Sequence, residues 1–249
     1  MATSLPTKLK KEPLIDAIFE VRFESKVAAS VVLPGVFFDK LPGNSKIEAL
    51  PTSQLPKALR DANPNLRFSP TNRIDWDKFF INVGDFNVSV SCKYPYPGWT
   101  SFKKAIIDVM HILQHSGVVK KVERYSLKYV DLLPIINGKH KVSMLNLKVD
   151  IAGHTLADEP FQFRIEILKD ELIHAVQLVS SAKARLHTGV VKDGLIVDVD
   201  TIAVLEDTSI SSLVEGIDNK LEVIHTANKK MFFDCLNHET LGMLEPEYE

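Results

Sequence analysis

The sequence predicts an α+β protein built around an antiparallel sheet. Segments in which polar and apolar residues alternate recur along the chain, and the clearest are Leu14–Phe23 and Phe161–Leu168. Helix-like segments follow groups of strands rather than standing between every two of them, which favours α+β over a doubly wound parallel sheet. The length of 249 residues, with 45 % hydrophobic and 25 % charged residues, suits one large domain or two small ones.

The N-terminal half, residues 1–134, is expected to contain strands, helices and one long loop. Its predicted strands are Leu14–Phe23, 79–82, 86–92 and Val119–Leu133, with Gly84 in the hairpin turn. Its predicted helices are Val31–Leu41, a short one near Leu55–Ala62, and one that Thr100 or Ser101 caps and that ends near Ser116. Residues 42–73 are rich in proline and asparagine, and loops of this length are usually functional or mobile.

The C-terminal half, residues 135–249, is expected to contain further strands and a long final helix. Its predicted strands are Lys141–Ile151, Phe161–Leu168, Leu172–Val179 and Leu195–Val204, with a turn at Asn137-Gly138 before the first. The inward residues of the second are Phe161, Phe163, Ile165 and Ile167. Ser212 and Glu215 have capping-box spacing, which predicts one helix over 210–237, about 40 Å long if unbroken.

The order of elements is similar in the two halves, since each has strands followed by a helix. We therefore expect two related halves that form one compact unit. In this arrangement a curved antiparallel sheet surrounds the helices at 101–116 and 210–237.

Charge and composition exclude several classes of function. With 30 Lys and Arg against 32 Asp and Glu, the net charge is −2, so bulk affinity for nucleic acid or an anionic membrane is not expected. The first thirteen residues lack the apolar run of a secretory signal, and Val27–Phe38 is shorter than the ~20 residues of a membrane helix. The two cysteines, Cys92 and Cys235, are too few and too distant for a disulfide scaffold or a Cys-rich zinc site. A cytoplasmic protein is expected.

Four short motifs resemble a known family. They are the strand Glu12–Phe23 that ends in Arg-Phe, Gly98-Trp99 before the middle helix, the strand Arg124–Asp131, and His225 followed by Phe232. The chain resembles a sporadically distributed bacterial family of uncharacterised function whose members have about this length. Lys128, Asp131 and Asp16 stand where the family pattern has Arg, Asn and Glu. The scattered distribution implies an accessory role in a defence or toxin-type system, and the family supplies no catalytic residue.

Charged residues on the outward faces of two predicted strands form the first candidate site. Glu20 and Arg22 lie on one strand, and Arg124 and Lys128 lie on the other. If the strands pair, these residues form either a solvated ladder of ion pairs worth ~0–1 kcal/mol each, or a groove that binds an anion. In the groove, Arg22 and Arg124 would hold a carboxylate or phosphate in bidentate fashion.

Aromatic residues and histidines are the other candidates. Tyr96 and Trp99 belong to a stiff loop, where they either pack on the hairpin or form an exposed recognition surface. His225, beside the apolar stripe of the last helix, is either a hydrogen-bonded packing residue or a ligand contact. His111 and His115 are four residues apart on the polar side of their helix and lack the HExxH pattern, so no metal is expected.

The chain contains no nucleophile elbow, P-loop, dinucleotide-binding or kinase motif, so no catalytic residue and no cofactor are assigned. We expect a non-enzymatic accessory protein that binds a protein partner, encoded by a neighbouring gene, as a regulator or neutralising factor in a defence or toxin system. The alternative is a small-molecule binding protein or enzyme, with a cavity between sheet and helix and a small acidic ligand.

Overall fold

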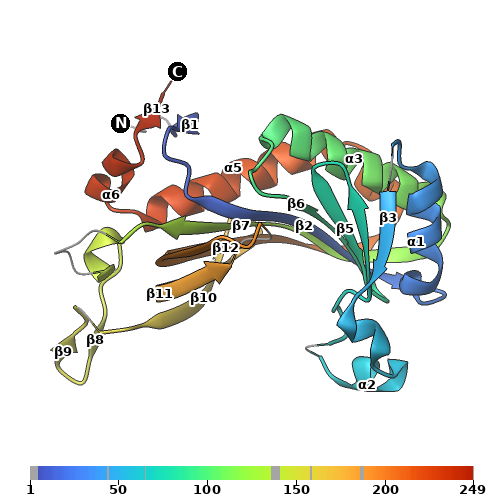
Figure 1. The fold of residues 1–249 in the computed structure, drawn as a ribbon, viewed down its shortest axis with the longest axis horizontal. Coiled ribbons are helices and arrows are strands. Elements are labelled where there is room, and N and C mark those ends of the chain that lie inside the picture. Colours follow the sequence, from blue (N-terminus) through green and yellow to red (C-terminus); the bar gives the residue numbers. More distant parts are fainter. Residues whose placement is uncertain are drawn as a thin grey trace. The chain divides into compact units, whose positions relative to one another are not determined.

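The computed structural model describes residues 5–43, 45–64, 66–135, 141–157, 159–185 and 188–248 (Figure 1). Its strands are β1 (Lys8–Leu9), β2 (Leu14–Ser25), β3 (Ser45–Ala49), β4 (Asn72–Trp76), β5 (Phe79–Val83), β6 (Asn87–Cys92), β7 (Val119–Leu133), β8 (Asp150–Ile151), β9 (His154–Thr155), β10 (Gln162–Lys169), β11 (Leu172–Arg185), β12 (Val191–Thr208) and β13 (Pro246–Glu247). Its helices are α1 (Ala29–Lys40), α2 (Lys57–Ala62), α3 (Trp99–His115), α4 (Ile210–Val214), α5 (Ile217–Cys235) and α6 (His238–Met243), with 3-10 helices η1 (Pro51–Gln54) and η2 (Lys141–Met144).

The largest sheet is open and contains nine strands, in the order β10-β11-β12-β7-β2-β6-β5-β4-β3. Each strand pair of this sheet whose register is described is antiparallel, including β2 with β6 and β4 with β5. The predicted α+β class, with a large antiparallel sheet and a long helix near the C-terminus, is therefore confirmed. The short strands β1 and β13 pair side by side outside this sheet (Figure 1).

The chain divides into two compact units. Unit 1 consists of Met1–Asp16, Lys128–Thr201 and His225–Glu249, and unit 2 consists of Ala17–Leu127 and Ile202–Ile224. Three strands, β2, β7 and β12, and helix α5 each contribute residues to both units. The units therefore interleave along the sequence and differ from the expected division at 134/135, while the pseudo-repeat stays a prediction.

In unit 1, residues near the C-terminus pack against strands. The buried cluster is Leu133, Met144, Leu145, Phe161, Val176, Leu178, Leu195, Val197, Val199, Met231, Phe232, Leu236 and Leu244. Asn228 is fully buried beside this cluster, and its amide donates to the Val199 carbonyl at 2.8 Å and to Thr201 Oγ1 at 2.9 Å. Thr201 Oγ1 also lies 3.0 Å from His174 Nδ1. Hydrogen bonds to the Asn228 amide nitrogen and to Thr201 Oγ1 thus offset part of the cost of burying these side chains.

In unit 2, α1 and α3 contact each other and pack on strands of the sheet (Figure 1). Phe102, Ile106 and Leu113 of α3 are fully buried and form the apolar side of this helix. Phe102 stacks on Phe79 of β5 with the ring centroids 6.3 Å apart.

Helix α1 forms although it contains Pro34. Proline has no N–H group, so the carbonyl of Ser30 loses its usual partner one turn later. The side-chain amide of Asn72, in β4, donates to this carbonyl at 3.1 Å. The sheet thus supplies the hydrogen bond that the sequence of the helix cannot make.

Two predicted elements are wrong because tertiary contacts decide them. Residues 141–151, expected to be one strand, contain η2 and then β8. Asn146 in this segment donates to the carbonyls of Asp234 and Leu236 at 3.0 and 2.7 Å, so the end of α5 holds it. The segment 42–73, expected to be a loop with one helix, also contains β3, which pairs with β4. Its mobility stays a prediction, and Asn137-Gly138 lies outside the described residues.

The expected helix 210–237 is interrupted. Gly216, with φ of 71°, separates α4 from α5, so the main helix has 19 residues and a length of ~28 Å. Ser209 rather than Ser212 caps α4, since its side chain accepts the Ser212 N–H at 3.1 Å. None of the described helices combines the length and apolar character that a bilayer crossing demands.

Two smaller expectations also fail. Gly98, with φ of 89°, precedes α3 in place of a Thr100 or Ser101 cap. Ile165, expected to point inward, is 57 % exposed because β10 is an edge strand and lacks a neighbour to cover it.

Candidate functional site

Glu20 is the centre of a polar cluster on one face of unit 2. Its Oε1 accepts hydrogen bonds from Arg22 Nε at 2.6 Å and from Arg124 Nη2 at 3.1 Å. Its Oε2 accepts one from Asn87 Nδ2 at 2.9 Å. We call Glu20, Arg22, Asn87 and Arg124 the Glu20 cluster. The arginine side chains are 27 % and 21 % exposed, so both ion pairs are partly withdrawn from water.

Strand geometry explains why these residues share one face. Successive side chains of a strand point to opposite sides of the sheet. The buried residues Phe19 and Val21 therefore leave Glu20 and Arg22 on the other side. In the pairing of β2 with β6, Arg22 lies opposite Asn87. Strands β2 and β7 are neighbours in the sheet, and this pairing brings Glu20, Arg22 and Arg124 into contact.

The cluster retains unused hydrogen-bond donors. The Nε of Arg124 is buried without a partner among the described residues. Arg22 donates through Nε, and no described residue accepts from its two terminal nitrogens. Two guanidinium groups share one carboxylate, so the cluster has excess positive charge as well as free donors. Such groups suit an anion with several acceptor oxygens.

Aromatic rings support the arginines. The guanidinium carbon of Arg22 lies 4.1 Å from the ring centre of Phe68. Arg67 lies 5.5 Å from the same ring and 5.3 Å from that of Phe86. A guanidinium group stacked in this way keeps its N–H groups directed outward in its own plane. Phe68 and Arg67 come from the segment 42–73, where the sequence has no periodic signal that could have identified them.

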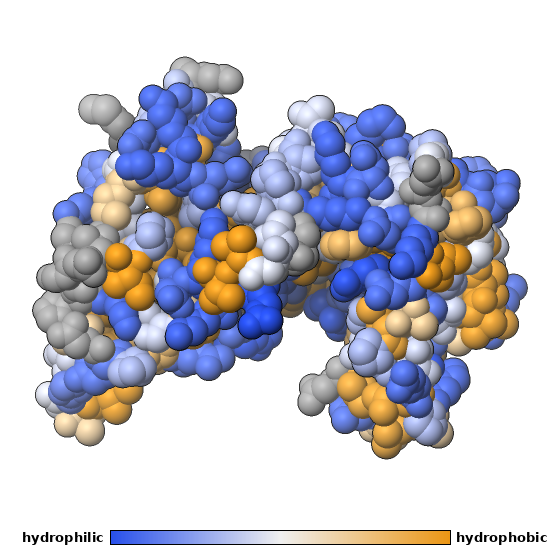
Figure 2. Space-filling view, in the orientation of Figure 1, coloured by the Kyte–Doolittle hydropathy of each residue, from blue (hydrophilic) through white to orange (hydrophobic). Residues whose placement is uncertain are grey.

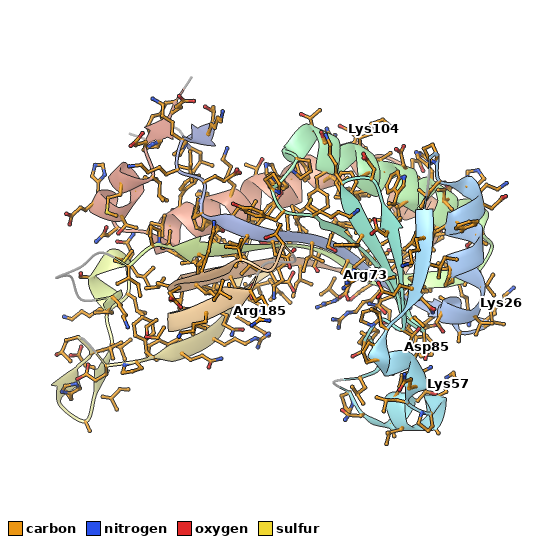
Figure 3. The ribbon with its side chains drawn as sticks, viewed as in Figure 1. Lys26, Lys57, Arg73, Asp85, Lys104 and Arg185 are labelled. Atoms are coloured by element: carbon orange, nitrogen blue, oxygen red, sulfur yellow. The ribbon has the colours of Figure 1, made fainter. Side chains whose placement is uncertain are left out.

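A buried ion pair anchors this segment to unit 2. Arg60 Nη2, in α2, donates to Asp85 Oδ2 at 2.8 Å, and the side chains are only 10 % and 2 % exposed. Ser30 of α1 donates to the other oxygen of Asp85. Figure 3 shows Asp85 at the base of the strands, near α2 and Lys57. Asp85 thus joins α1, α2 and the β5–β6 turn.

The polar face continues beyond the Glu20 cluster. Glu20 of β2 lies opposite Ser89 of β6, and Ser89 lies opposite Asn82 of β5. Asn82 in turn lies opposite Arg73 of β4. Arg73, labelled in Figure 3, donates to Asn82 Oδ1 at 3.0 Å and lies 4.7 Å from the ring centre of Phe80. Arg73 is three strand spacings from Glu20, about 14 Å.

Lys128 belongs to unit 1, where its Nζ lies 2.7 Å from Asp198 Oδ2. Near this pair, Asp131 is only 5 % exposed. Burial first, and then the charges of Glu12 and Asp198, raise the pKa of the Asp131 carboxyl well above its usual range. Burial also raises the pKa of Asp198, against the lowering effect of Lys128. Lys128 thus offsets part of the negative charge of the neighbouring carboxyl groups of Glu12, Asp131 and Asp198.

Asp131→Asn is expected to stabilise the protein at neutral pH. The raised pKa means that Asp131 favours the fold when protonated, and that this contribution is lost as pH rises through the folded-state pKa. Asparagine resembles the protonated form of aspartate at every pH. The gain in the free energy of unfolding should therefore vanish near pH ~4, where the aspartate of the unfolded chain also binds a proton. Urea denaturation at both pH values measures this. Asp193→Asn, at an exposed position of unit 1, is the control and should show no such gain; equal effects would contradict the prediction.

The aromatic candidates pack against α3. Trp99 and Tyr96 both contact Phe102 edge-on, with centroids 6.3 and 6.2 Å apart. Trp99 Nε1 donates to Glu222 Oε1 at 3.0 Å. His225 Nδ1 lies 3.1 Å from the Tyr129 hydroxyl. These contacts agree with the interpretation of Tyr96, Trp99 and His225 as residues that pack against their neighbours.

His111 and His115 lie on the exposed side of α3, as predicted, and His115 Nδ1 is 2.7 Å from the His111 carbonyl. Within the described ranges, no group of three or more His, Cys, Asp or Glu side chains is arranged to hold a metal ion. Burial raises the pKa of the Cys235 thiol to about 11, so this cysteine is protonated and unreactive at neutral pH.

No family model matches the chain, and no curated protein matches it. The resemblance to the sporadically distributed bacterial family therefore stays a prediction.

Proposed function

We propose that this protein is a non-enzymatic binding protein that recognises an acidic group of its partner, a carboxylate or phosphate, at the Glu20 cluster. One observation carries the proposal. Arg22 and Arg124 share a single carboxylate oxygen, while no described residue accepts from the two terminal nitrogens of Arg22, whose side chain is 27 % exposed. A partly buried donor without an acceptor is costly, and an incoming anion removes that cost.

Preorganisation supports binding at this place. Both arginines are on strands, whose backbone directs the side chains more precisely than a loop does. Glu20 holds the two guanidinium groups near each other against their mutual repulsion, and Phe68 supports Arg22 from its face. Less side-chain entropy is lost on binding when the side chains are already held.

The partner is proposed to be a protein, because the cluster consists of several side chains spread over one sheet face, which a macromolecule can cover. The role as a regulator or neutralising factor in a bacterial defence or toxin system depends on the resemblance alone. A small acidic ligand at the same cluster is the competing occupant, and the experiment below separates the two.

We expect Arg124→Ala to weaken binding of an acidic partner by ~2–5 kcal/mol, the usual effect of removing one member of a close charge pair. Calorimetric titration with a glutamate-rich peptide, a phosphoserine peptide and inorganic phosphate measures this. Binding of a peptide alone supports a protein partner, whereas binding of free phosphate alone supports a small ligand.

Arg73→Ala is the matched control, since Arg73 lies on the same face and also stacks on a phenylalanine. It should leave affinity unchanged. Both variants should melt within a few degrees of the wild type. Equal affinity of the wild type, Arg124→Ala and Arg73→Ala for every probe would contradict recognition at the Glu20 cluster.

A further inference from the structure

Helix α1 of unit 2 has an apolar outer face. A helix at a protein surface usually turns a polar side to water. In α1 no charged residue occurs before Asp39, at the end of the helix. The exposed apolar residues are Val27, two residues before the helix, at 52 %, Val31 at 79 %, Val32 at 37 % and Phe38 at 52 %. Figure 2 shows apolar residues gathered where α1 lies in Figure 1.

Gly35 lies within this face and has no function in the single chain. A glycine inside a helix costs ~1 kcal/mol relative to alanine. A Cβ added at Gly35 would meet nothing within 4 Å, and the residue has ordinary helical backbone geometry. Neither the backbone nor the packing of unit 2 therefore requires glycine. A small residue on an exposed helix face allows another helix to approach closely.

The outer face also has a charge at each end. Val31, Gly35 and Phe38 follow one another at helical spacing and form a line on α1, and with Val27, which lies two residues before the helix, we call them the α1 stripe. Lys26 precedes the stripe, is exposed, and forms no ion pair within the described part of the chain (Figure 3). Asp39 follows the stripe and pairs with its neighbour Lys40 at 2.9 Å, with both side chains mostly exposed. Exposed pairs of this kind are weak and exchange readily.

We propose that a second copy of this chain docks on the α1 stripe, with the two α1 helices antiparallel about a two-fold axis. A two-fold interface must be complementary to itself. In the antiparallel arrangement, Val31 of each copy enters the space above Gly35 of the other, and Phe38 covers Val27. Lys26 then meets Asp39 of the other copy at both ends. The pattern is thus complementary in shape and in charge.

The proposed dimer is reversible. One pair of 12-residue helices covers less surface than the ~1,200–2,000 Å² of a stable specific interface. The fraction of dimer should therefore rise with protein concentration. This inference concerns a surface separate from the Glu20 cluster and does not depend on the proposed function.

Sedimentation velocity over a concentration series tests the proposal. The wild type should show a monomer–dimer equilibrium, and Val31→Asp should raise the dissociation constant by about tenfold or more without changing the thermal melt. Val223→Asp is the matched control, because Val223 is a valine of unit 2 that is 62 % exposed on α5. A wild type that stays monomeric throughout, or an equal effect of Val223→Asp, would overturn the proposal.

Three further variants distinguish a shaped interface from a merely apolar patch. Gly35→Leu should raise the melting temperature, because leucine favours helix, yet weaken the dimer, because it fills the space that Val31 needs. Stronger association of Gly35→Leu would overturn the proposed arrangement. Lys26→Glu should weaken the dimer and the double variant Lys26→Glu/Asp39→Lys should restore it; a double variant as weak as the single one would also overturn it.

Discussion

Leu221→Asp is expected to unfold the protein. Leu221 lies on α5 in unit 2 and is fully buried. Removing a buried leucine side chain costs ~2–5 kcal/mol, and burying an unpaired carboxylate adds several kcal/mol. Together these costs reach the ~5–15 kcal/mol by which a domain is usually stable. Far-UV circular dichroism should show loss of the cooperative melt.

Val223→Asp on the same helix is the control for this prediction. Val223 is 62 % exposed, so an aspartate there stays in water and should change stability by no more than ~0.5 kcal/mol. A Leu221→Asp melt within a few degrees of the Val223→Asp melt would show that this face of α5 is not buried, and the packing of unit 2 would be wrong.

Asp85→Ala is expected to lower the free energy of unfolding by ~3–5 kcal/mol, because it leaves the buried Arg60 guanidinium without its carboxylate. Ser30 loses its acceptor as well. Since Arg60 anchors the segment that carries Phe68, the same variant should weaken anion binding at the Glu20 cluster. Urea denaturation measures the first effect, and the peptide titration measures the second.

Asp61→Ala provides the comparison, because Asp61 pairs with Lys57 one helical turn away and both side chains are largely exposed. Such a pair contributes only ~0.3–0.5 kcal/mol. The double variant Arg60→Met/Asp85→Ala should be more stable than Asp85→Ala alone, since no charge is then left buried. If Asp85→Ala costs no more than Asp61→Ala, the pair does not anchor the segment.

Local patterns predicted several elements because their information lies in neighbouring residues. The strand Val119–Leu133 agrees with the prediction at both ends, and its residues Tyr125 and Leu127 are buried. Alternation of polarity needs no knowledge of the partner strand. The break at Gly216 was missed because the apolar stripe continues across it, although glycine with positive φ commonly ends a helix.

Part of the candidate site was also predicted from the alternation of polarity within single strands. Glu20, Arg22 and Arg124 were identified because alternation places them on the outward face of their strands. Asn87 and Phe68 were not, since their place in the site depends on strand register and on how the segment 42–73 folds back. Sequence alone also left open whether the charged face is an ion-pair ladder or a groove with unused donors.

The α+β class and the outward faces of the long strands were predictable from local patterns, because each follows from a period of two or 3.6 residues within one segment. Three other features became visible only in the fold: Arg60 and Asp85 are paired and buried, β3 completes the sheet, and two units interleave along the chain. These features depend on contacts between residues far apart in the sequence, where burial changes the energy of a charge and register selects its partner.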